Sequence, residues 1–171
     1  MIEIKNVSKH FDNILALDQI NATMAEGHVF GLIGTNGAGK STLLRALCGV
    51  LKPEQGEILV DGEPIYENPS AKSKLFYISD DQYFFPNDTP MDMVRYYTTF
   101  YPNFDEGRFE HLLEILQLDK QRRINTFSKG MKKQLSVILG ICAGAKYLLC
   151  DETFDGLDPV IKKKKKSLFI K

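Results

Sequence analysis

Eight consecutive residues are of the types and at the spacing that bind phosphate. Gly34, Thr35, Asn36, Gly37, Ala38, Gly39, Lys40 and Ser41 match the pattern GxxxxGK[ST] in full. Glycines let consecutive backbone N–H groups point at phosphate oxygens, and a helix that begins near Gly39 adds the positive end of its dipole. Lys40 would neutralise the β and γ phosphates of a nucleotide. Ser41 would ligate Mg²⁺, and the Thr42 hydroxyl would lie near the α phosphate.

The residues on both sides of this loop predict the elements that position it. The apolar run 29–33 ends at Gly34 and predicts a buried strand, and leucines recur at helical spacing in the range 40–51. Strand, glycine loop and helix in this order are the start of a βα unit. Upstream, the ranges 2–7 and 14–24 alternate apolar and polar residues, which predicts two half-exposed antiparallel strands joined by a turn at 12–13.

The rest of the chain adds strands and helices in alternation. We expect strands at 57–60, 75–79 and 147–150, the last ending in Asp151 and Glu152. Apolar residues at three- and four-residue steps predict helix between 89 and 123, and again from 130 to 143. Strands that alternate with helices indicate a mostly parallel sheet in an α/β fold.

Composition excludes several classes of function. The chain has 171 residues, 43% hydrophobic and 26% charged, which is typical of one globular domain with a core. Lys plus Arg and Asp plus Glu both total 22, so the net charge gives no attraction to nucleic acid. No apolar run reaches the roughly 18 residues of a membrane helix, and no signal segment opens the chain, so we expect a cytoplasmic protein.

Two further segments resemble motifs of the ABC-transporter ATP-binding family. Residues 127–131, FSKGM, look like a variant of the LSGGQ signature, and residues 148–159, LLCDETFDGLDP, closely resemble LLLDEPTxGLDP. With the phosphate loop, three motifs stand in the family's order over residues 1–159, the expected ABC ATPase domain. The resemblance implies a P-loop NTPase core with an N-terminal antiparallel β subdomain and an inserted α-helical subdomain at about 89–143. It also implies that C-terminal strands are missing.

The resemblance assigns roles to residues outside the loop. It makes Asp151 a Mg²⁺ ligand and Glu152 the catalytic base that polarises the attacking water. Phe11 stands at the position of the aromatic residue that stacks on adenine, and the alternative is a core residue on an edge strand. Ser128 and the Gly130 backbone would contact the γ-phosphate held by a second subunit. Ser128 is also a good N-cap for the helix that follows, and both roles can hold together.

Several positions depart from the family's pattern. Asp80 stands where a glutamine is usual and Gln82 follows two residues later, so the Mg²⁺ or water contact of this loop is open between the two. Thr153 and Phe154 replace the usual Pro and Thr, and Lys129 and Met131 alter the signature in a way associated with bacterial export-type ATPases.

The C-terminal segment is the largest departure from the pattern. After residue 159 the family continues through further sheet and a switch histidine, whereas here only a Lys-rich tail, 160–171, remains and the three histidines lie upstream. The five lysines at 162–166 fit a helix face with a premature stop, a shifted reading frame or a basic tail. We therefore expect a truncated domain with impaired hydrolysis.

The resemblance implies an ATP-binding subunit that couples ATP binding and hydrolysis to transport by a membrane permease. Its expected partners are ATP with Mg²⁺, the permease, and a second ATPase subunit in a head-to-tail dimer, with no nucleic acid. The alternative is a nucleotide-binding module that binds ATP without hydrolysing it. Aromatic residues 83–85 would belong to the permease-docking face or to the core of the helical insertion. The subunit is expected at the inner face of the cell membrane.

Overall fold

A computed structural model describes residues 1–152 of the chain, and these form two compact units. The first comprises Met1–Tyr77 and Ala145–Asp151, and the second comprises Ile78–Gly144 with Glu152. The expectations for Thr153, Phe154 and the tail 160–171 fall outside the described residues.

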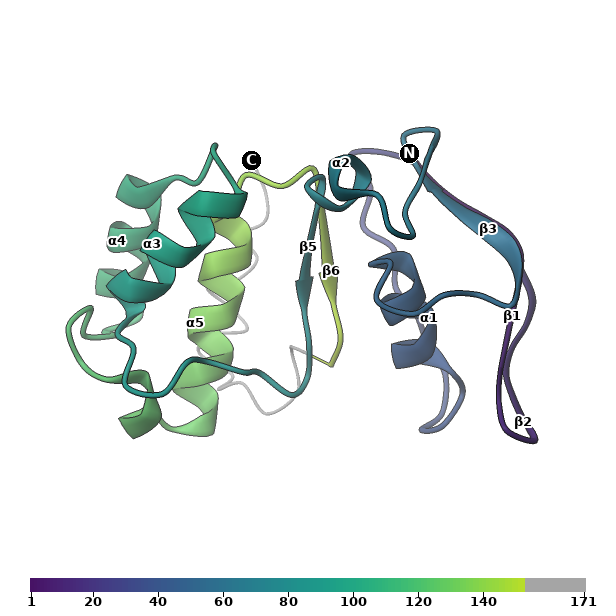
Figure 1. The fold of residues 1–171 in the computed structure, drawn as a ribbon. Helices are drawn as coiled ribbons and strands as arrows, with labels where there is room; N and C mark the ends of the chain where they lie inside the picture. The colour runs from purple at the N-terminus through teal and green to yellow at the C-terminus, as the bar shows by residue number, and fades with distance from the viewer. Residues whose placement is uncertain (153–171) are drawn as a thin grey trace. The chain divides into compact units, whose positions relative to one another are not determined.

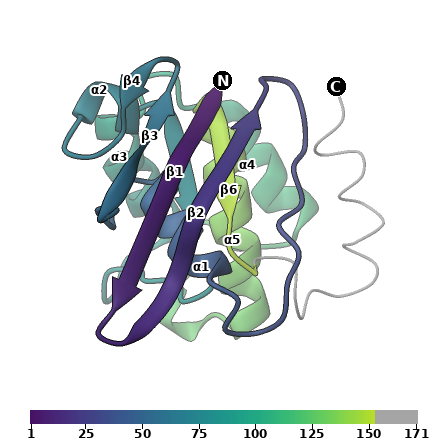
Figure 2. The same ribbon diagram turned by 90° about the vertical axis from the view of Figure 1, so that its right-hand side faces the viewer.

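The first unit begins with an antiparallel sheet whose strand order is β2-β1-β3-β4. Strand β1 (Ile2–Phe11) pairs with β2 (Ile14–Met24) on one side and with β3 (Gln55–Val60) on the other, and β4 (Glu63–Pro64) closes the edge. Figure 2 shows the three long strands side by side. The predicted antiparallel strands and the turn between them are confirmed, and β3 joins the same sheet.

A second, two-stranded sheet contains β5 (Leu75–Ile78) and β6 (Tyr147–Cys150). The two strands point the same way in Figure 1, so they are parallel although about seventy residues of chain lie between them. The Tyr147 amide donates to the Lys74 carbonyl at 3.0 Å. Both strands were predicted, whereas the short helix α2 (Pro69–Lys72) ahead of β5 was not.

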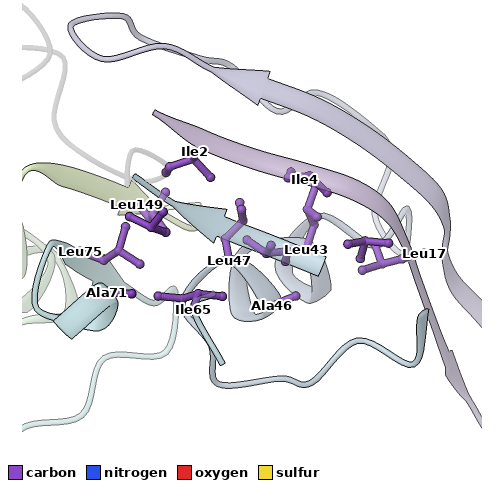
Figure 3. Close-up of a cluster of buried hydrophobic side chains, with 13 residues drawn as sticks. Ile2, Ile4, Leu17, Leu43, Ala46, Leu47, Ile65, Ala71, Leu75 and Leu149 are labelled. Carbon is purple, nitrogen blue, oxygen red and sulfur yellow. The ribbon is translucent and has the colours of Figure 1, made fainter. Parts of the chain in front are cut away.

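Helix α1 (Lys40–Leu47) follows the glycine loop, as predicted, and its apolar face packs into the core of the first unit. The core draws on every helix and strand of that unit except β4, and Figure 3 shows a close-up of it. Its members are Ile2, Ile4, Val7, Leu17, Leu43, Ala46, Leu47, Ile58, Val60, Ile65, Ala71, Leu75 and Leu149. Each large aliphatic side chain buried here contributes about 1.5–3 kcal/mol. The polar residues that adjoin α1 and β6 are thus held by apolar packing directly beside them.

The strand predicted at 29–33 is wrong. These residues form no strand in the structure, and the side chains of Val29 and Ile33 are 100% and 95% exposed. An apolar run becomes a strand only where a neighbouring strand accepts its backbone hydrogen bonds. Within residues 1–152 neither sheet supplies such a neighbour for this run. The run therefore leads into the glycine loop as irregular chain.

The second unit is helical and contains α3 (Pro90–Phe100), α4 (Glu106–Ile115), a 3-10 turn (Ile124–Thr126) and α5 (Lys129–Cys142). Figure 1 shows α3 and α4 beside α5. A capping box of Thr89 and Asp92 starts α3, and the predicted helical stretch is broken at Pro102, where a helix cannot continue. The buried residues include Met93, Val94, Phe109, Leu112, Leu113, Leu135, Ile138 and Leu139.

We expect Gly39→Ala to destabilise the protein more than Gly37→Ala. Both glycines have positive φ, 80° and 82°, so either alanine costs about 1–2 kcal/mol in backbone strain. A Cβ at Gly39 would also lie 2.3 Å from the Ala16 carbonyl oxygen, whereas at Gly37 it would have no neighbour within 4 Å among the described residues. Overpacking of this kind costs typically about 1–3 kcal/mol more. Urea denaturation measures both variants, and equal losses of unfolding free energy would contradict the close contact.

Candidate functional site

The side chain of Lys40 folds back over the glycine loop and contacts the loop's backbone. Lys40 is the first residue of α1, and its Nζ donates to the carbonyl oxygens of Gly34 and Thr35 at 2.9 and 2.8 Å. The Ala38 amide donates to the Thr35 carbonyl at 3.2 Å and tightens the turn between them. The ammonium group therefore lies at the centre of the loop that the sequence predicts to bind phosphate.

Helix α1 begins without a side-chain cap. Its N-cap is Gly39 in the left-handed conformation, and the first helical bond runs from the Leu43 amide to the Gly39 carbonyl. The amides ahead of Leu43 have no acceptor within the helix, which makes this end of α1 suitable for an anion. Asn36 and Ala38 are exposed in the loop, while Ser41 and Thr42 are half-buried in the first turn. The structure thus brings all the predicted loop residues together.

Asp151 is the buried carboxylate of the first unit, with 4% of its surface exposed. Ser41 Oγ donates to Asp151 Oδ1 at 3.1 Å, and the Tyr77 hydroxyl donates to Asp151 Oδ2 at 3.2 Å. Two residues that the sequence assigned to Mg²⁺, 110 positions apart, therefore touch each other. Tyr77 was not predicted as part of the site.

The hydroxyl and carboxylate of this pair suit Mg²⁺, which prefers hard oxygen ligands. An octahedral ion with ligands at about 2.1 Å places neighbouring ligand oxygens about 3.0 Å apart, close to the 3.1 Å between Ser41 Oγ and Asp151 Oδ1. Within residues 1–152, no three His, Cys, Asp or Glu side chains gather into a metal site. An ion held here would need phosphate oxygens and water as further ligands.

Phe11, predicted to stack on adenine, lies at the end of β1 and is 45% exposed. It is not part of the core, so the alternative of a buried residue is wrong. The Lys9 ammonium lies 5.7 Å from the centre of its ring. Adenine stacking itself stays a prediction.

In the second unit, Ser128 is the N-cap of α5, and its Oγ accepts a hydrogen bond from the Met131 amide at 3.2 Å. The capping role is therefore confirmed. Among residues 1–152, a Cβ at Gly130 would meet only Ser128 Oγ, at 3.8 Å, so packing within this part of the chain does not require glycine there. The contact of both residues with a second subunit's phosphate stays a prediction.

Asp80 and Gln82 line an open hollow of about 240 Å³ in the second unit, together with Asp81, Lys129, Lys132 and Lys133. The buried Lys133 ammonium donates to Asp80 Oδ1 at 2.9 Å and to the Glu152 carbonyl oxygen at 3.3 Å. Its hydrogen bond holds the pKa of the Asp80 carboxyl below its usual range. The Gln82 side-chain nitrogen is buried without an acceptor among the described residues. Which of Asp80 and Gln82 contacts Mg²⁺ stays open.

Sequence reasoning missed Tyr77 and Lys133. Each gives a signal in retrospect, because a polar group inside an apolar pattern needs a partner when it is buried. Tyr77 is the third residue of the apolar strand LFYI, and Lys133 lies one helical turn before the buried Val137 of α5. The partners, Asp151 and Asp80, are too distant in the sequence for spacing to reveal them.

The predicted docking aromatics are partly exposed. Tyr83 and Phe85 are 75% and 41% exposed, which excludes both from the core of the helical unit, whereas Phe84 is half-buried. The ring of Phe85 meets Tyr83 at 5.8 Å and Tyr96 of α3 at 5.2 Å between centroids. None of the helices within residues 1–152 has the length and hydropathy to cross a bilayer.

Comparison with known proteins gives consistent matches. The family model described as ABC transporter matches residues 17–155. The ABC transporter ATP-binding protein YtrB of Bacillus subtilis (strain 168) is 33% identical over 162 residues, which cover 95% of this chain and 56% of that protein. The chain spans about half the length of most of the curated relatives compared.

Solved structures agree with the fold. The ATP binding subunit of an ABC transporter superposes with a TM-score of 0.87 at 25% identity, over 98% of this chain and 72% of the other. A dimeric post-hydrolysis ATP-binding cassette bound to ADP and phosphate gives a TM-score of 0.83 at 21% identity, over 98% and 81%, and supports the fold alone. The predicted α/β class with a P-loop NTPase core is confirmed.

We expect Lys133→Met to lower the free energy of unfolding by about 0.5–1 kcal/mol, because the ion pair with the half-exposed Asp80 is lost while the apolar stem is kept. Lys132→Met, at the neighbouring position, should stay within about 0.5 kcal/mol of wild type. Because the pKa of Asp80 is lowered in the folded protein, its ion pair with Lys133 stabilises the fold at neutral pH. This stabilisation is lost as the pH falls below about 4.

Urea denaturation of both variants at pH 7 and pH 3 measures this. The deficit of Lys133→Met should shrink at the lower pH. A deficit of the same size at both pH values would show that packing, and not the ion pair, is responsible.

Proposed function

Because the chain belongs to the ABC transporter family, we propose that it is the ATP-binding part of a subunit that drives transport by a membrane permease. The observation that carries the proposal is the contact between the phosphate loop and the end of β6, where Ser41 meets Asp151 at 3.1 Å. The loop supplies N–H groups and an ammonium for phosphates, and this pair supplies oxygens for a cation. The residues proposed to bind phosphate and those proposed to bind the metal thus lie side by side in one compact unit.

Different residues of the site would bind different parts of ATP. Lys40 would exchange the loop carbonyls that it contacts for β and γ phosphate oxygens, and the amides of the first turn of α1 would bind phosphate at the positive end of the helix. Mg²⁺, when bound, would neutralise phosphate charge. Ser41 and Asp151 would hold it, and Phe11 would stack on the base.

Glu152 is the residue we propose as catalytic base. It is exposed, in contrast to the preceding Asp151, and its carboxylate is therefore accessible to water. It would orient the attacking water and accept its proton. The alternative is a nucleotide-binding module that binds ATP without turnover.

ABC ATP-binding subunits work with membrane components and form dimers. For this chain we infer a head-to-tail dimer, with itself or with another ATPase subunit, in which Ser128 and the Gly130 amide face the γ-phosphate of the other subunit. The open space around Gly130 supports this role, because packing among residues 1–152 does not require glycine there. An amide at the start of α5 also has the polarity to meet an anion.

The permease would dock on the exposed aromatic surface of the helical unit, formed by Tyr83, Phe85, Tyr96 and Phe100. Their rings are in edge and tilted contact with one another at 5.1–5.8 Å. Exposed aromatic clusters of this kind are typical of protein interfaces. Such docking would place the subunit at the inner face of the cell membrane.

Lys40→Ala is expected to weaken ATP binding by about 10- to 100-fold, because a charge-assisted hydrogen bond contributes about 1.5–3 kcal/mol. Lys52→Ala is the matched control, since Lys52 is an exposed lysine of the same unit that lies over the ring of Tyr66. Calorimetric titration with ATP measures both. Equal affinity of Lys40→Ala and wild type, or no ATP binding by wild type, would overturn the proposed function.

Glu152→Gln is expected to keep ATP affinity while phosphate release falls by about 10²–10⁴-fold, since the amide cannot accept the proton of water. Phosphate release from ATP by the purified chain measures this. Unchanged release would exclude Glu152 as the base. ATP binding by wild type without any release would favour the module that binds but does not hydrolyse.

A further inference from the structure

We propose that Tyr77 is a positioning residue for nucleotide-bound Mg²⁺, acting through Asp151. Its hydroxyl holds one oxygen of the Asp151 carboxylate so that the other oxygen faces Ser41. This inference rests on the proposed ATP binding, but it concerns a residue that no motif of the phosphate site includes.

Two hydrogen bonds link the three side chains, with Asp151 between Tyr77 and Ser41. Tyr77 comes from β5, Asp151 directly follows the neighbouring strand β6, and Ser41 lies in the first turn of α1. The carboxylate is 4% exposed and accepts a hydrogen bond at each oxygen, 3.2 Å from Tyr77 and 3.1 Å from Ser41. Because the partners approach opposite oxygens, the carboxylate is fixed in rotation as well as in position.

The chemistry of the donor matters for a metal site. A phenol donates a hydrogen bond without carrying a positive charge, so Tyr77 leaves the full negative charge of Asp151 for a cation. A lysine or arginine at the same place would compete with Mg²⁺ electrostatically. With Mg²⁺ bound, Ser41 and Asp151 would be the residues that hold it, and the hydrogen bond from Tyr77 to Asp151 Oδ2 would not have to break. Tyr77 thus holds the carboxylate in both states.

Packing alone does not account for the hydroxyl. Tyr77 is half-buried, whereas the other residues of β5 are all buried and apolar, including Phe76 beside it. A phenylalanine ring fills such a place without the cost of a polar group that needs a partner. The hydroxyl is explained by the carboxylate it contacts.

The chain offers a matched control in Tyr147, at the start of β6. It is half-buried in the same unit, and its hydroxyl donates to another aspartate, Asp61 Oδ1, at 2.7 Å. Asp61 keeps the Met1 ammonium and Lys146 as partners when this hydroxyl is removed. Tyr147→Phe therefore makes the same chemical change in the same sheet without touching Asp151.

The test compares the affinity of each variant for a non-hydrolysable ATP analogue in Mg²⁺ and in EDTA, by calorimetric titration. Tyr77→Phe is expected to lose about ten-fold in affinity with Mg²⁺, the typical effect of removing an outer-shell partner of a metal ligand. Its affinity in EDTA should equal that of wild type. Tyr147→Phe should match wild type in both conditions. Thermal unfolding confirms that both variants are folded.

Each outcome decides the proposal. Loss confined to Tyr77→Phe with Mg²⁺ supports it. If Tyr77→Phe matches Tyr147→Phe, or weakens binding equally in Mg²⁺ and EDTA, Tyr77 does not act through the metal and the proposal fails while ATP binding stands. No binding by wild type in either condition would overturn the proposed function, and this inference with it.

Discussion

The first unit depends on one buried carboxylate, Asp151, whose burial is costly unless polar partners surround it. The partners come from distant parts of the sequence, 74 and 110 residues away. Their meeting requires that α1, β5 and β6 take fixed positions to within the tolerance of a hydrogen bond. The requirement links the local pattern of the glycine loop to the arrangement of the whole unit.

Apolar packing meets that requirement. Leu43 and Leu47 of α1, Leu75 of β5 and Leu149 of β6 belong to the same core as the inward-facing residues of the antiparallel sheet. Each polar residue of the site is near in sequence to one of them: Ser41 precedes Leu43, Tyr77 follows Leu75, and Asp151 follows Leu149. Because the core is close-packed, it fixes the positions of these elements and of the polar residues near their ends. The site is thereby organised by side chains that do no chemistry.

The sequence predicted the features that depend on short stretches of chain. It did not predict those that depend on a partner far away in the sequence. The glycine loop, helix α1 and the strand before Asp151 follow from short patterns, and the structure brings Ser41 and Asp151 together as their assigned roles require. The run 29–33 has the composition of a buried strand, but strand formation depends on a partner that composition does not reveal.

The partners of Tyr77 and Lys133 show the same limit. Their hydrogen bonds span 74 and 53 residues, and no spacing rule connects such positions. The spacing does reveal that Tyr77 and Lys133 are polar residues within apolar patterns. A polar group that is buried needs a hydrogen-bond partner, but the pattern does not identify that partner.

Asp151 and Glu152 are adjacent acids with opposite surroundings, and the backbone between them explains the contrast. Asp151 is buried in the first unit, whereas Glu152 has a left-handed φ of 45° and is exposed, with its carbonyl oxygen accepting from Lys133. Positive φ is uncommon for a residue with a side chain, and it turns the chain sharply after the strand. One carboxylate is thus immobilised, as a metal ligand needs, and the next is left accessible to water, as a base needs. If β6 continued as a regular strand, the side chains of Asp151 and Glu152 would point to opposite faces of the sheet. Glu152 would then still be part of the sheet.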